Sequence, residues 1–374
     1  MKHSGIILFF ITVLMLIAGA VYYLSNRFAF FFPSVPFKAW LWGFIGTIVL
    51  FFSLSLFPLV MQNFAGKIGF VSGALLIAIL LYLLLSVATT DLLSLLFKMP
   101  LVVRAVTSLA ITVLLVLYGV ISASVIKVKE ISIPIDGLTN EIKAVHITDI
   151  HLGNIWGKKR LEKITNKIIA LQPDLVFNTG DIFDSNIHFY NGINVLEPFQ
   201  KLTVPHYFVY GNHDESVGVE EVIQHMKMSG VIVLQNEMVH FDELQIIGLN
   251  NMLRDENSFA MHAQPGAGTI KSLMEQLPIE ENRPAIVLHH RPDGMEYLNA
   301  KKINLLLSGH THGGQLFPIT LLTKALFKYN KGLYRYKDLN IYVSAGAGTI
   351  GMPVRVGTVS EITFIKLVPK TEKQ

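Results

Sequence analysis

The sequence predicts a two-part protein, in which an α-helical membrane region over residues 1–126 is followed by an α/β domain over residues 127–374. The first observation is the uneven distribution of charge. Residues 1–126 contain one acidic and six basic residues, whereas the whole chain has 27 acidic and 31 basic residues. The second is a set of four long apolar stretches in the same region. The third is the alternation of short β-rich runs with helical stretches beyond it.

The composition excludes several classes of function. No cysteine occurs in the chain, which excludes disulfides, thiolate zinc sites and cysteine nucleophiles. The net charge of +4 comes from sparse basic residues beside the apolar runs rather than from a basic face, so charge does not indicate nucleic-acid binding. Because 51% of residues are hydrophobic and concentrate at one end, a wholly soluble chain is also excluded.

Each apolar stretch reaches the roughly 20 residues that a helix needs to cross a bilayer. We place the four spans near residues 6–24, 40–60, 68–87 and 105–126. None of these ranges contains an ionisable residue, which favours an anchor over a transporter. Residues 89–97 (TTDLLSLLF) are interpreted as a short interfacial helix.

The first stretch has a second interpretation as a cleaved signal peptide, because Lys2 precedes an apolar run that ends in Ala18-Gly19-Ala20. Its length favours a retained helix. The loops on the two sides of the membrane carry four basic residues each, so the positive-inside rule selects no orientation. We expect an integral protein of the cell membrane and leave the side of the α/β domain open.

The α/β domain begins with a strand at residues 141–147, an amphipathic helix at 158–170 and a second strand at 174–177. Further strands are predicted at residues 206–210, 231–234, 244–247, 285–288, 303–307, 340–343 and 361–367. This alternation indicates a mostly parallel sheet with covering helices. About 240 residues are enough for a single large core.

Side chains that can bind metal follow five of these strands. The groups are Asp149-Ile150-His151, Gly180-Asp181, Gly211-Asn212-His213-Asp214, His289-His290-Arg291-Pro292 and Gly309-His310-Thr311-His312. Each group alone would be ordinary loop chemistry. Together they favour a metal site, because open α/β sheets bind ligands outside the carboxyl ends of their strands.

The spacing within these groups has a physical meaning. In the Asp-x-His and His-x-His groups one residue separates the two ligands, and in an extended chain both side chains then point the same way. Glycines precede several ligands, where the chain must turn sharply or pass close to a charged centre. Carboxylate, imidazole and amide ligands together suit Mn²⁺, Fe²⁺ or Zn²⁺.

The order of the five groups resembles the calcineurin-like metallophosphoesterase family over essentially all of the α/β domain. The resemblance is greatest to the membrane-associated branch of this family, whose sequences read like the segments TDIHLGNIWG, NTGDIFD, VYGNHD, SGHTHGGQ and VSAGAGTIGMPVRVG of this chain. The resemblance implies a four-layer α/β/β/α sandwich with two facing sheets and a centre of two divalent metal ions.

The resemblance also implies roles for nine residues. One metal would be held by Asp149, His151, Asp181 and His312, with Asp181 bridging to a second metal held also by Asn212, His290 and His310. The two cations would polarise phosphoryl oxygens and lower the pKa of a bridging water, whose hydroxide attacks in line. His213 would contact phosphate and protonate the leaving oxygen. Asp214 would orient that imidazole, although family members often carry glutamate there.

Residues beside these motifs need separate interpretations. His290 stands two residues before Pro292, where the family places its ligand, so His289 is interpreted as structural. Arg291 is either a phosphate contact or a solvated surface charge. Trp156 either lines an acyl or headgroup pocket or packs against its neighbours.

Residues 346–351 (GAGTIG) match the dinucleotide-binding spacing G-x-G-x-x-G after a strand. A dinucleotide loop must open a helix, whereas Pro353 and the alternating Val354 and Val356 predict extended chain. We therefore interpret the segment as a loop, which the resemblance places at the border of the metal site.

Two functions remain. The first is a membrane-anchored di-metal phosphohydrolase that cleaves a phosphodiester or pyrophosphate in a phosphorylated small molecule or lipid, such as a nucleotide-linked acyl sugar, because some relatives resemble UDP-diacylglucosamine hydrolases. The alternative is a non-catalytic membrane sensor or scaffold that binds a phosphorylated ligand through the metal domain. The presence of both His213 and Asp181 favours the hydrolase. No protein partner is predicted.

Overall fold

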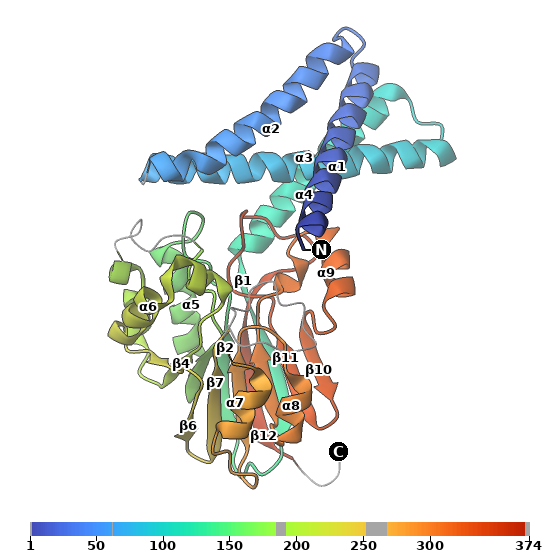
Figure 1. Ribbon diagram of the computed structural model, residues 1–374. Helices are drawn as coiled ribbons and strands as arrows, with labels where there is room; N and C mark the ends of the chain where they lie inside the picture. Colours follow the sequence, from blue (N-terminus) through green and yellow to red (C-terminus); the bar gives the residue numbers. More distant parts are fainter. Residues whose placement is uncertain (1, 62, 185–191, 252–267, 371–374) are drawn as a thin grey trace. The chain divides into compact units, whose positions relative to one another are not determined.

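The computed structural model describes residues 2–61, 63–184, 192–251 and 268–370 (Figure 1). The chain divides into two compact units, Met1–Val120 and Ile121–Gln374, which are described separately. The division falls inside the last long apolar helix, and the predicted boundary after residue 126 stays a prediction.

Four helices make up the N-terminal unit. They are α1 (Lys2–Phe31), α2 (Phe37–Val60), α3 (Phe64–Leu96) and α4 (Leu101–Ser124), whose last turn belongs to the C-terminal unit. Each contains a segment long and apolar enough to cross a membrane, as predicted. The Asn63 side chain caps α3 by accepting the backbone N–H groups of Ala65 and Gly66.

The structure corrects the prediction of a separate helix at residues 89–97. Helix α3 continues to Leu96, because no glycine or proline interrupts residues 74–96. The helices therefore extend beyond the predicted spans and include charged residues. The carboxylate of Asp91 lies 2.6 Å from Nε of Arg27 and 3.6 Å from a terminal guanidinium nitrogen of Arg104, so the charges of these three residues are paired within the unit.

The C-terminal unit contains two six-stranded sheets. In spatial order, the first is β1 (Ile126–Ile135), β12 (Ser360–Pro369), β2 (Ile142–Ile147), β3 (Leu175–Asn178), β4 (His206–Phe208) and β5 (Ile232–Val233). The second is β10 (Gly332–Tyr336), β11 (Leu339–Val343), β9 (Leu305–Ser308), β8 (Ala285–His289), β7 (Leu244–Leu249) and β6 (Glu237–Phe241). All nine predicted strands are present, and β1, β6 and β10 are additional edge strands.

Helices cover the outer face of each sheet and give four layers, as the family resemblance implies (Figure 1). Helices α5 (Lys158–Leu171) and α6 (Asn212–Met228) bury residues such as Leu161 and Val222 against the first sheet. Helices α7 (Ile270–Gln276) and α8 (Met295–Ala300) do the same against the second. A third apolar cluster, which includes Phe177 and Leu307, fills the space between the sheets.

Strand direction decides where the loops gather. Strands β2, β3 and β4 are parallel, and so are β7, β8 and β9, so each set ends at one edge of its sheet. Strand β12 is antiparallel to β2 and parallel to β1. The first residue of β1, Ile126, pairs with Ser360, and therefore the chain enters this sheet at the edge where β2 ends.

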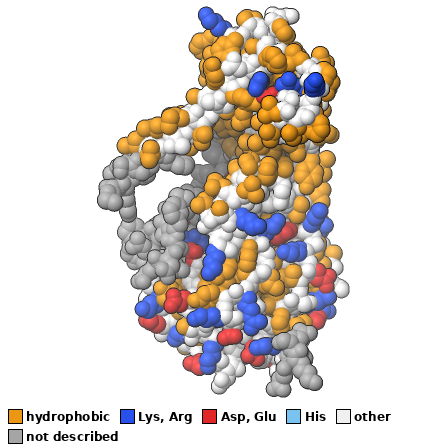
Figure 2. Space-filling view, turned by 90° about the vertical axis from the view of Figure 1, so that its right-hand side faces the viewer, with side chains coloured by type: hydrophobic (Ala, Val, Ile, Leu, Met, Phe, Trp, Pro, Cys, Tyr) orange, Lys and Arg blue, Asp and Glu red, His pale blue; other side chains and the backbone are white. Residues whose placement is uncertain are grey.

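Charge is distributed differently over the two units. Figure 2 shows side chains of both charge signs scattered over the C-terminal unit, whereas hydrophobic side chains cover most of the helical unit. This agrees with the uneven charge of the sequence, in which residues 1–126 hold a single acidic residue.

Candidate metal centre

Side chains from five loops meet where the strands of the two sheets end. Three groups of potential ligand atoms each lie within 4.8 Å of one another; two are buried, and the third, His151, Asp184 and His213, is partly exposed. The first group is Asp149, His151 and His312, and the second is Asp149, Asp181 and His290. The loops after β2, β3, β8 and β9 supply them, which is the convergence that the strand order predicts.

The first group brings imidazole nitrogens onto a carboxylate. Nε2 of His312 lies 3.3 Å from Oδ1 of Asp149 and 3.0 Å from Nε2 of His151. Nε2 of His151 is also 3.8 Å from the same Asp149 oxygen. Two imidazole nitrogens and a carboxylate oxygen that face one point form a donor set typical of a borderline divalent cation.

The second group is oriented by a backbone carbonyl. Nδ1 of His290 lies 2.6 Å from the carbonyl oxygen of Thr179 and donates its proton there, so Nε2 is the nitrogen that remains to face a cation. That buried Nε2 has no hydrogen-bond partner and lies 3.2 Å from Oδ2 of Asp181. A buried imidazole nitrogen aimed at a carboxylate fits a positive charge between the two.

Asp181 connects the two groups. Its Oδ2 atom is 3.2 Å from Nε2 of His290 and 3.7 Å from Nε2 of His151. The ring of His310 lies beside that of His290, with 5.2 Å between the ring centroids. Nδ1 of His310 lies 2.9 Å from the amide oxygen of Asn212. All seven predicted ligands therefore lie in one cluster.

Electrostatics within the cluster favour positive charge between the carboxylates. Burial alone would raise the pKa of Asp149 and Asp181, but the facing imidazoles hold both well below the ordinary range. Burial alone would lower the pKa of His290 and His151, yet the carboxylates raise these values to about 9 and about 10. Positive charge thus stabilises the cluster, and divalent cations can supply it.

The backbone of the ligand loops corrects the prediction of extended Asp-x-His and His-x-His segments. Five of the predicted ligands adopt the left-handed region: Asp149 (φ 51°), His151 (φ 51°), Asp181 (φ 53°), His310 (φ 71°) and His312 (φ 50°). The chain turns sharply where β2 and β9 end, so the ligand pairs are set by turns rather than by a pleat. Such conformations are uncommon for residues with a Cβ, and they cluster at functional sites.

Two glycines leave room for the ligand carboxylates, as predicted. A Cβ at Gly309 would overlap Oδ2 of Asp149, and a Cβ at Gly211 would overlap Oδ1 of Asp181. Both carboxylates are fixed by backbone N–H groups, because His310 donates to Asp149 and His213 donates to Asp181. Close packing therefore holds the ligand oxygens in place.

His213 lies at the border of the cluster beside a carboxylate that the sequence interpretation did not include. Its side chain is 24% exposed, and its Nδ1 is 3.3 Å from Oδ1 of Asp184. The same oxygen is 3.3 Å from Nδ1 of His151. Asp184 follows Asp181 by three residues in the NTGDIFD segment, and this was the available signal.

Asp214, predicted to orient His213, has different contacts in the structure. Its two carboxylate oxygens accept four backbone N–H groups at 2.8–3.2 Å, from Gly211, Asp181, Ile182 and Phe183. The side chain is fully buried. It therefore joins the loop after β3 to the start of α6.

His289 and Arg291, the neighbours of His290 in the chain, make contacts of their own. His289 is fully buried with its Nδ1 3.3 Å from the carbonyl oxygen of Leu249, and burial lowers its pKa to about 3. Arg291 is only 4% exposed, and its Nε lies 3.2 Å from Asp293. Its interpretation as a solvated surface charge is therefore wrong.

The GAGTIG segment borders the cluster as a loop. Backbone N–H groups of Ala347 and Gly348 donate to the carbonyl oxygens of Thr148 and Asp149. No helix begins between residues 346 and 359, all of which the structure describes. The fully buried Arg355 guanidinium, which sequence analysis missed, donates to the carbonyl oxygen of Gly348 and fixes the loop.

Trp156 packs beside this loop. Its indole N–H donates to Oγ1 of Thr349 at 2.8 Å, and the guanidinium of Arg160 lies 4.3 Å from its ring centroid. These contacts support the packing interpretation rather than a substrate pocket.

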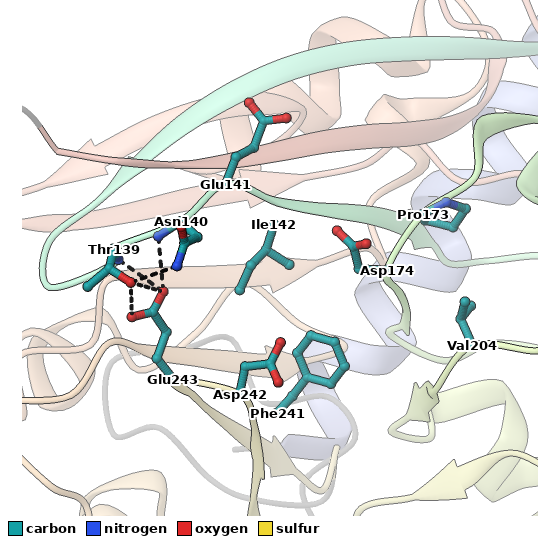
Figure 3. A pocket seen from close by; sticks show the side chains of 10 residues that line it. All are labelled: Thr139, Asn140, Glu141, Ile142, Pro173, Asp174, Val204, Phe241, Asp242 and Glu243. Carbon is teal, nitrogen blue, oxygen red and sulfur yellow. Dashed lines mark hydrogen bonds between the residues drawn. The ribbon is translucent and has the colours of Figure 1, made fainter.

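A cavity of ≈ 630 Å³ lies at the opposite edge, where β2, β3, β4 and β7 begin (Figure 3). Two of the four acidic residues that line it accept backbone N–H groups: Glu243 accepts those of Thr139 and Asn140, and Asp174 accepts that of Lys143. None of the predicted ligands lines it. The cavity is therefore separate from the candidate metal centre.

Comparison with known proteins gives one family. The model of the calcineurin-like phosphoesterase family matches residues 142–314. An uncharacterized metallophosphoesterase of Helicobacter pylori strain J99 is 33% identical over 250 residues, which are 66% of this chain and 65% of that protein. An uncharacterized metallophosphoesterase of Bacillus subtilis is 33% identical over 260 residues, which are 64% of this chain and 89% of that protein.

Relatives with membrane regions are also found. The transmembrane protein with metallophosphoesterase domain of Danio rerio is 32% identical over 282 residues, which are 71% of this chain and 62% of that protein. The chain thus spans just under two thirds of the length of the Helicobacter and Danio relatives. Among solved structures, TT1561 of Thermus thermophilus aligns with a TM-score of 0.37 and 12% identity over 55% of this chain and 91% of that chain.

Proposed function

Because the chain belongs to the calcineurin-like phosphoesterase family, we propose that it is a metal-dependent phosphohydrolase of the cell membrane that cleaves a phosphodiester or a pyrophosphate. One observation carries the proposal. A single Asp181 oxygen approaches both His290 and His151, so one carboxylate can serve two cation positions. Four apolar helices that can cross a membrane support the location.

The ligand assignment follows from these contacts. One cation would be held by Asp149, His151, Asp181 and His312, and the other by Asn212, His290, His310 and the shared Asp181. Two such cations would polarise the phosphoryl oxygens and lower the pKa of an attacking water. The nitrogen and oxygen donors suit Mn²⁺, Fe²⁺ or Zn²⁺.

His213 would protonate the leaving oxygen. Asp184, at 3.3 Å from Nδ1, holds that side of the imidazole and leaves Nε2 for the substrate. We assign the orienting role to Asp184 rather than to Asp214, because Asp214 has both oxygens engaged by backbone N–H groups. Asp214 shapes the loops that carry Asp181 and His213.

The anchor supports an amphipathic substrate, such as a phosphorylated lipid or a lipid-linked nucleotide. Confinement to a membrane raises the effective concentration of an active site toward substrates in the same membrane. The helical unit pairs the charges of Arg27 and Arg104 with Asp91, which supports an anchoring role rather than transport.

The test is hydrolysis of bis(p-nitrophenyl) phosphate by the full chain in lipid nanodiscs, with Mn²⁺ and with chelator. His213→Ala should lower the rate at least about 100-fold and leave bound metal unchanged. His240→Ala is the matched control, because the His240 side chain is 44% exposed on β6 and should not affect turnover.

A second variant tests the shared ligand. Asp181→Ala should lose bound metal together with the rate, and two metals per chain in this variant would refute the bridging assignment. Wild-type protein that binds two metals but hydrolyses neither phosphodiesters nor pyrophosphates would favour the alternative, a sensor or scaffold that binds a phosphorylated ligand.

A further inference from the structure

Helix α9 (Ile319–Leu326) turns its leucines away from the protein. Leu321, Leu322 and Leu326 are 59%, 57% and 69% exposed, and no residue of the helix is buried. Phe317, just before the helix, is 45% exposed. We call Phe317, Ile319, Leu321, Leu322 and Leu326 the α9 apolar face.

The opposite side of the same helix packs through threonines. A Cβ at Gly314 would overlap Oγ1 of Thr323, and a Cβ at Gly357 would lie 3.3 Å from the methyl group of Thr320. Polar residues thus face the domain and leucines face outward, which reverses the pattern of a surface helix in water. An apolar face of this kind marks an interaction site.

Basic and aromatic residues flank the α9 apolar face along the sequence. Residues 315–337 include five basic and five aromatic residues and no acidic residue. Lys324, Lys328 and Lys331 are exposed. Leucine, aromatic and lysine side chains on one short helix and its flanks are typical of a segment that lies in the interface of an anionic membrane.

The α9 apolar face lies beside the candidate metal centre. Residues 310–312 lead through the turn at His312–Gly314 into α9, and the ring of Phe327 lies 6.0 Å from that of His310. The last turn of α4 is held at the same edge of this unit, because Arg160 donates to the carbonyl oxygens of Ala123 and Ser124. The chain therefore enters this unit from α4 at this edge.

We propose that the α9 apolar face lies in the headgroup interface of a phospholipid bilayer that contains anionic lipid. A second copy of the chain fits less well, because it would set two basic segments, each without an acidic residue over residues 315–337, against each other. If the chain is also the phosphohydrolase proposed above, the metal centre lies beside a face that is at the level of lipid phosphates. Its substrate class would then be phosphate esters or anhydrides of membrane amphiphiles.

The cysteine-free chain allows a direct test by single-site labelling. Leu322→Cys carries an environment-sensitive fluorophore, and the full chain is reconstituted in phosphatidylcholine vesicles with and without phosphatidylglycerol. The matched control is Ile169→Cys on α5, where the side chain is 45% exposed and α5 begins at the metal edge but ends at the opposite edge. Nitroxide-labelled lipid and aqueous iodide serve as quenchers.

The expected result is loss of fluorescence at position 322 with nitroxide lipid, protection from iodide, and a larger effect with phosphatidylglycerol. Position 169 should show the reverse. Quenching by iodide at both positions would overturn the proposal. Protection of position 322 from both quenchers would also overturn it, because protein would then cover the face.

The readout requires no turnover, so its failure is separate from failure of the proposed hydrolase. If the hydrolase assignment holds, Leu322→Ser with Leu326→Ser should lower the rate on a vesicle-embedded phosphodiester about tenfold by weakening interfacial contact. The same variant should keep the rate on bis(p-nitrophenyl) phosphate. An equal loss on both substrates would indicate damage to the metal centre instead.

Discussion

The carboxylate of Asp184 lies 3.3 Å from Nδ1 of His213, and the same oxygen lies 3.3 Å from Nδ1 of His151. One acidic side chain therefore contacts both a candidate metal ligand and the candidate proton donor. Interactions of the facing imidazoles hold the pKa of Asp184 below its usual range even though burial opposes this. Asp184 can thus keep both imidazoles oriented over a wide range of pH.

Asp184→Asn should lower kcat about 10- to 100-fold, because the amide orients His213 less well and weakens the support of His151. Metal affinity should fall as well, and KM for a small phosphodiester should change little. Rate, KM and bound metal measured on the full chain check this. Asp338→Asn is the control, since the Asp338 side chain is 93% exposed, and unchanged kcat in Asp184→Asn would remove the orienting role.

Asp214→Asn should act mainly on stability. The substituted amide places a donor where the carboxylate now accepts backbone N–H groups, and each buried group left unpaired costs about 1–3 kcal/mol. Thermal unfolding of the C-terminal unit within the full chain should shift down by several degrees at about 2–4 °C per kcal/mol. A variant with native Tm but a lost rate would return Asp214 to a direct role in catalysis.

The contrast between these two residues shows what could be predicted from sequence. The order of strands and motifs predicted the ligand cluster, because parallel strands end at a common edge. The partner of His213 was not predictable from adjacency, since Asp214 follows it directly while Asp184 reaches it through space from another loop. Left-handed backbone at ligands such as Asp149 was missed because alternation within a strand does not extend beyond its last residue.

Helix α9 was missed for a different reason. Its leucines have the composition of a core helix, and sequence alone does not show which side faces the protein. The side is set by close contacts at Gly314 and Gly357, where Thr323 and Thr320 of α9 pack against the glycines. The length of α3 was misjudged because residues 89–97 were interpreted as a separate interfacial helix with the charged Asp91 near its start, whereas ion pairs with Arg27 and Arg104 compensate that charge.

Gly309→Ala should disrupt metal binding without a backbone penalty. Gly309 does not require the left-handed region, but an added Cβ would overlap Oδ2 of Asp149 and Oγ1 of Thr148. The carboxylate must move, and positions held within about 0.5 Å are needed for a productive site. Bound metal per chain should fall, while Gly46→Ala, which meets nothing within 4 Å, should retain it. Equal metal content in both variants would contradict this account.

The buried imidazole of His206, which is not one of the predicted metal ligands, should make the stability of the protein depend on pH. The His206 imidazole is buried, with its ring 4.7 Å from that of Phe199 and its Nε2 3.3 Å from the Asn178 side-chain nitrogen. Burial lowers its pKa to about 3, compared with roughly 6.5 when unfolded. Because the folded pKa is depressed, the unfolded state binds a proton more readily. The contribution of the neutral His206 imidazole to stability is therefore complete above about pH 6.5 and declines as pH falls toward 3.

The maximum slope from this one group is about 1.4 kcal/mol per pH unit. Thermal unfolding of wild type and His206→Gln should be compared at several pH values from 7.5 to 5, in the same lipid and with chelator present. The Tm advantage of the wild type should narrow as pH falls, because glutamine does not titrate. A constant difference across this range would mean that His206 is solvated or protonated in the folded state, and the burial of β4 beside Phe199 would then need revision.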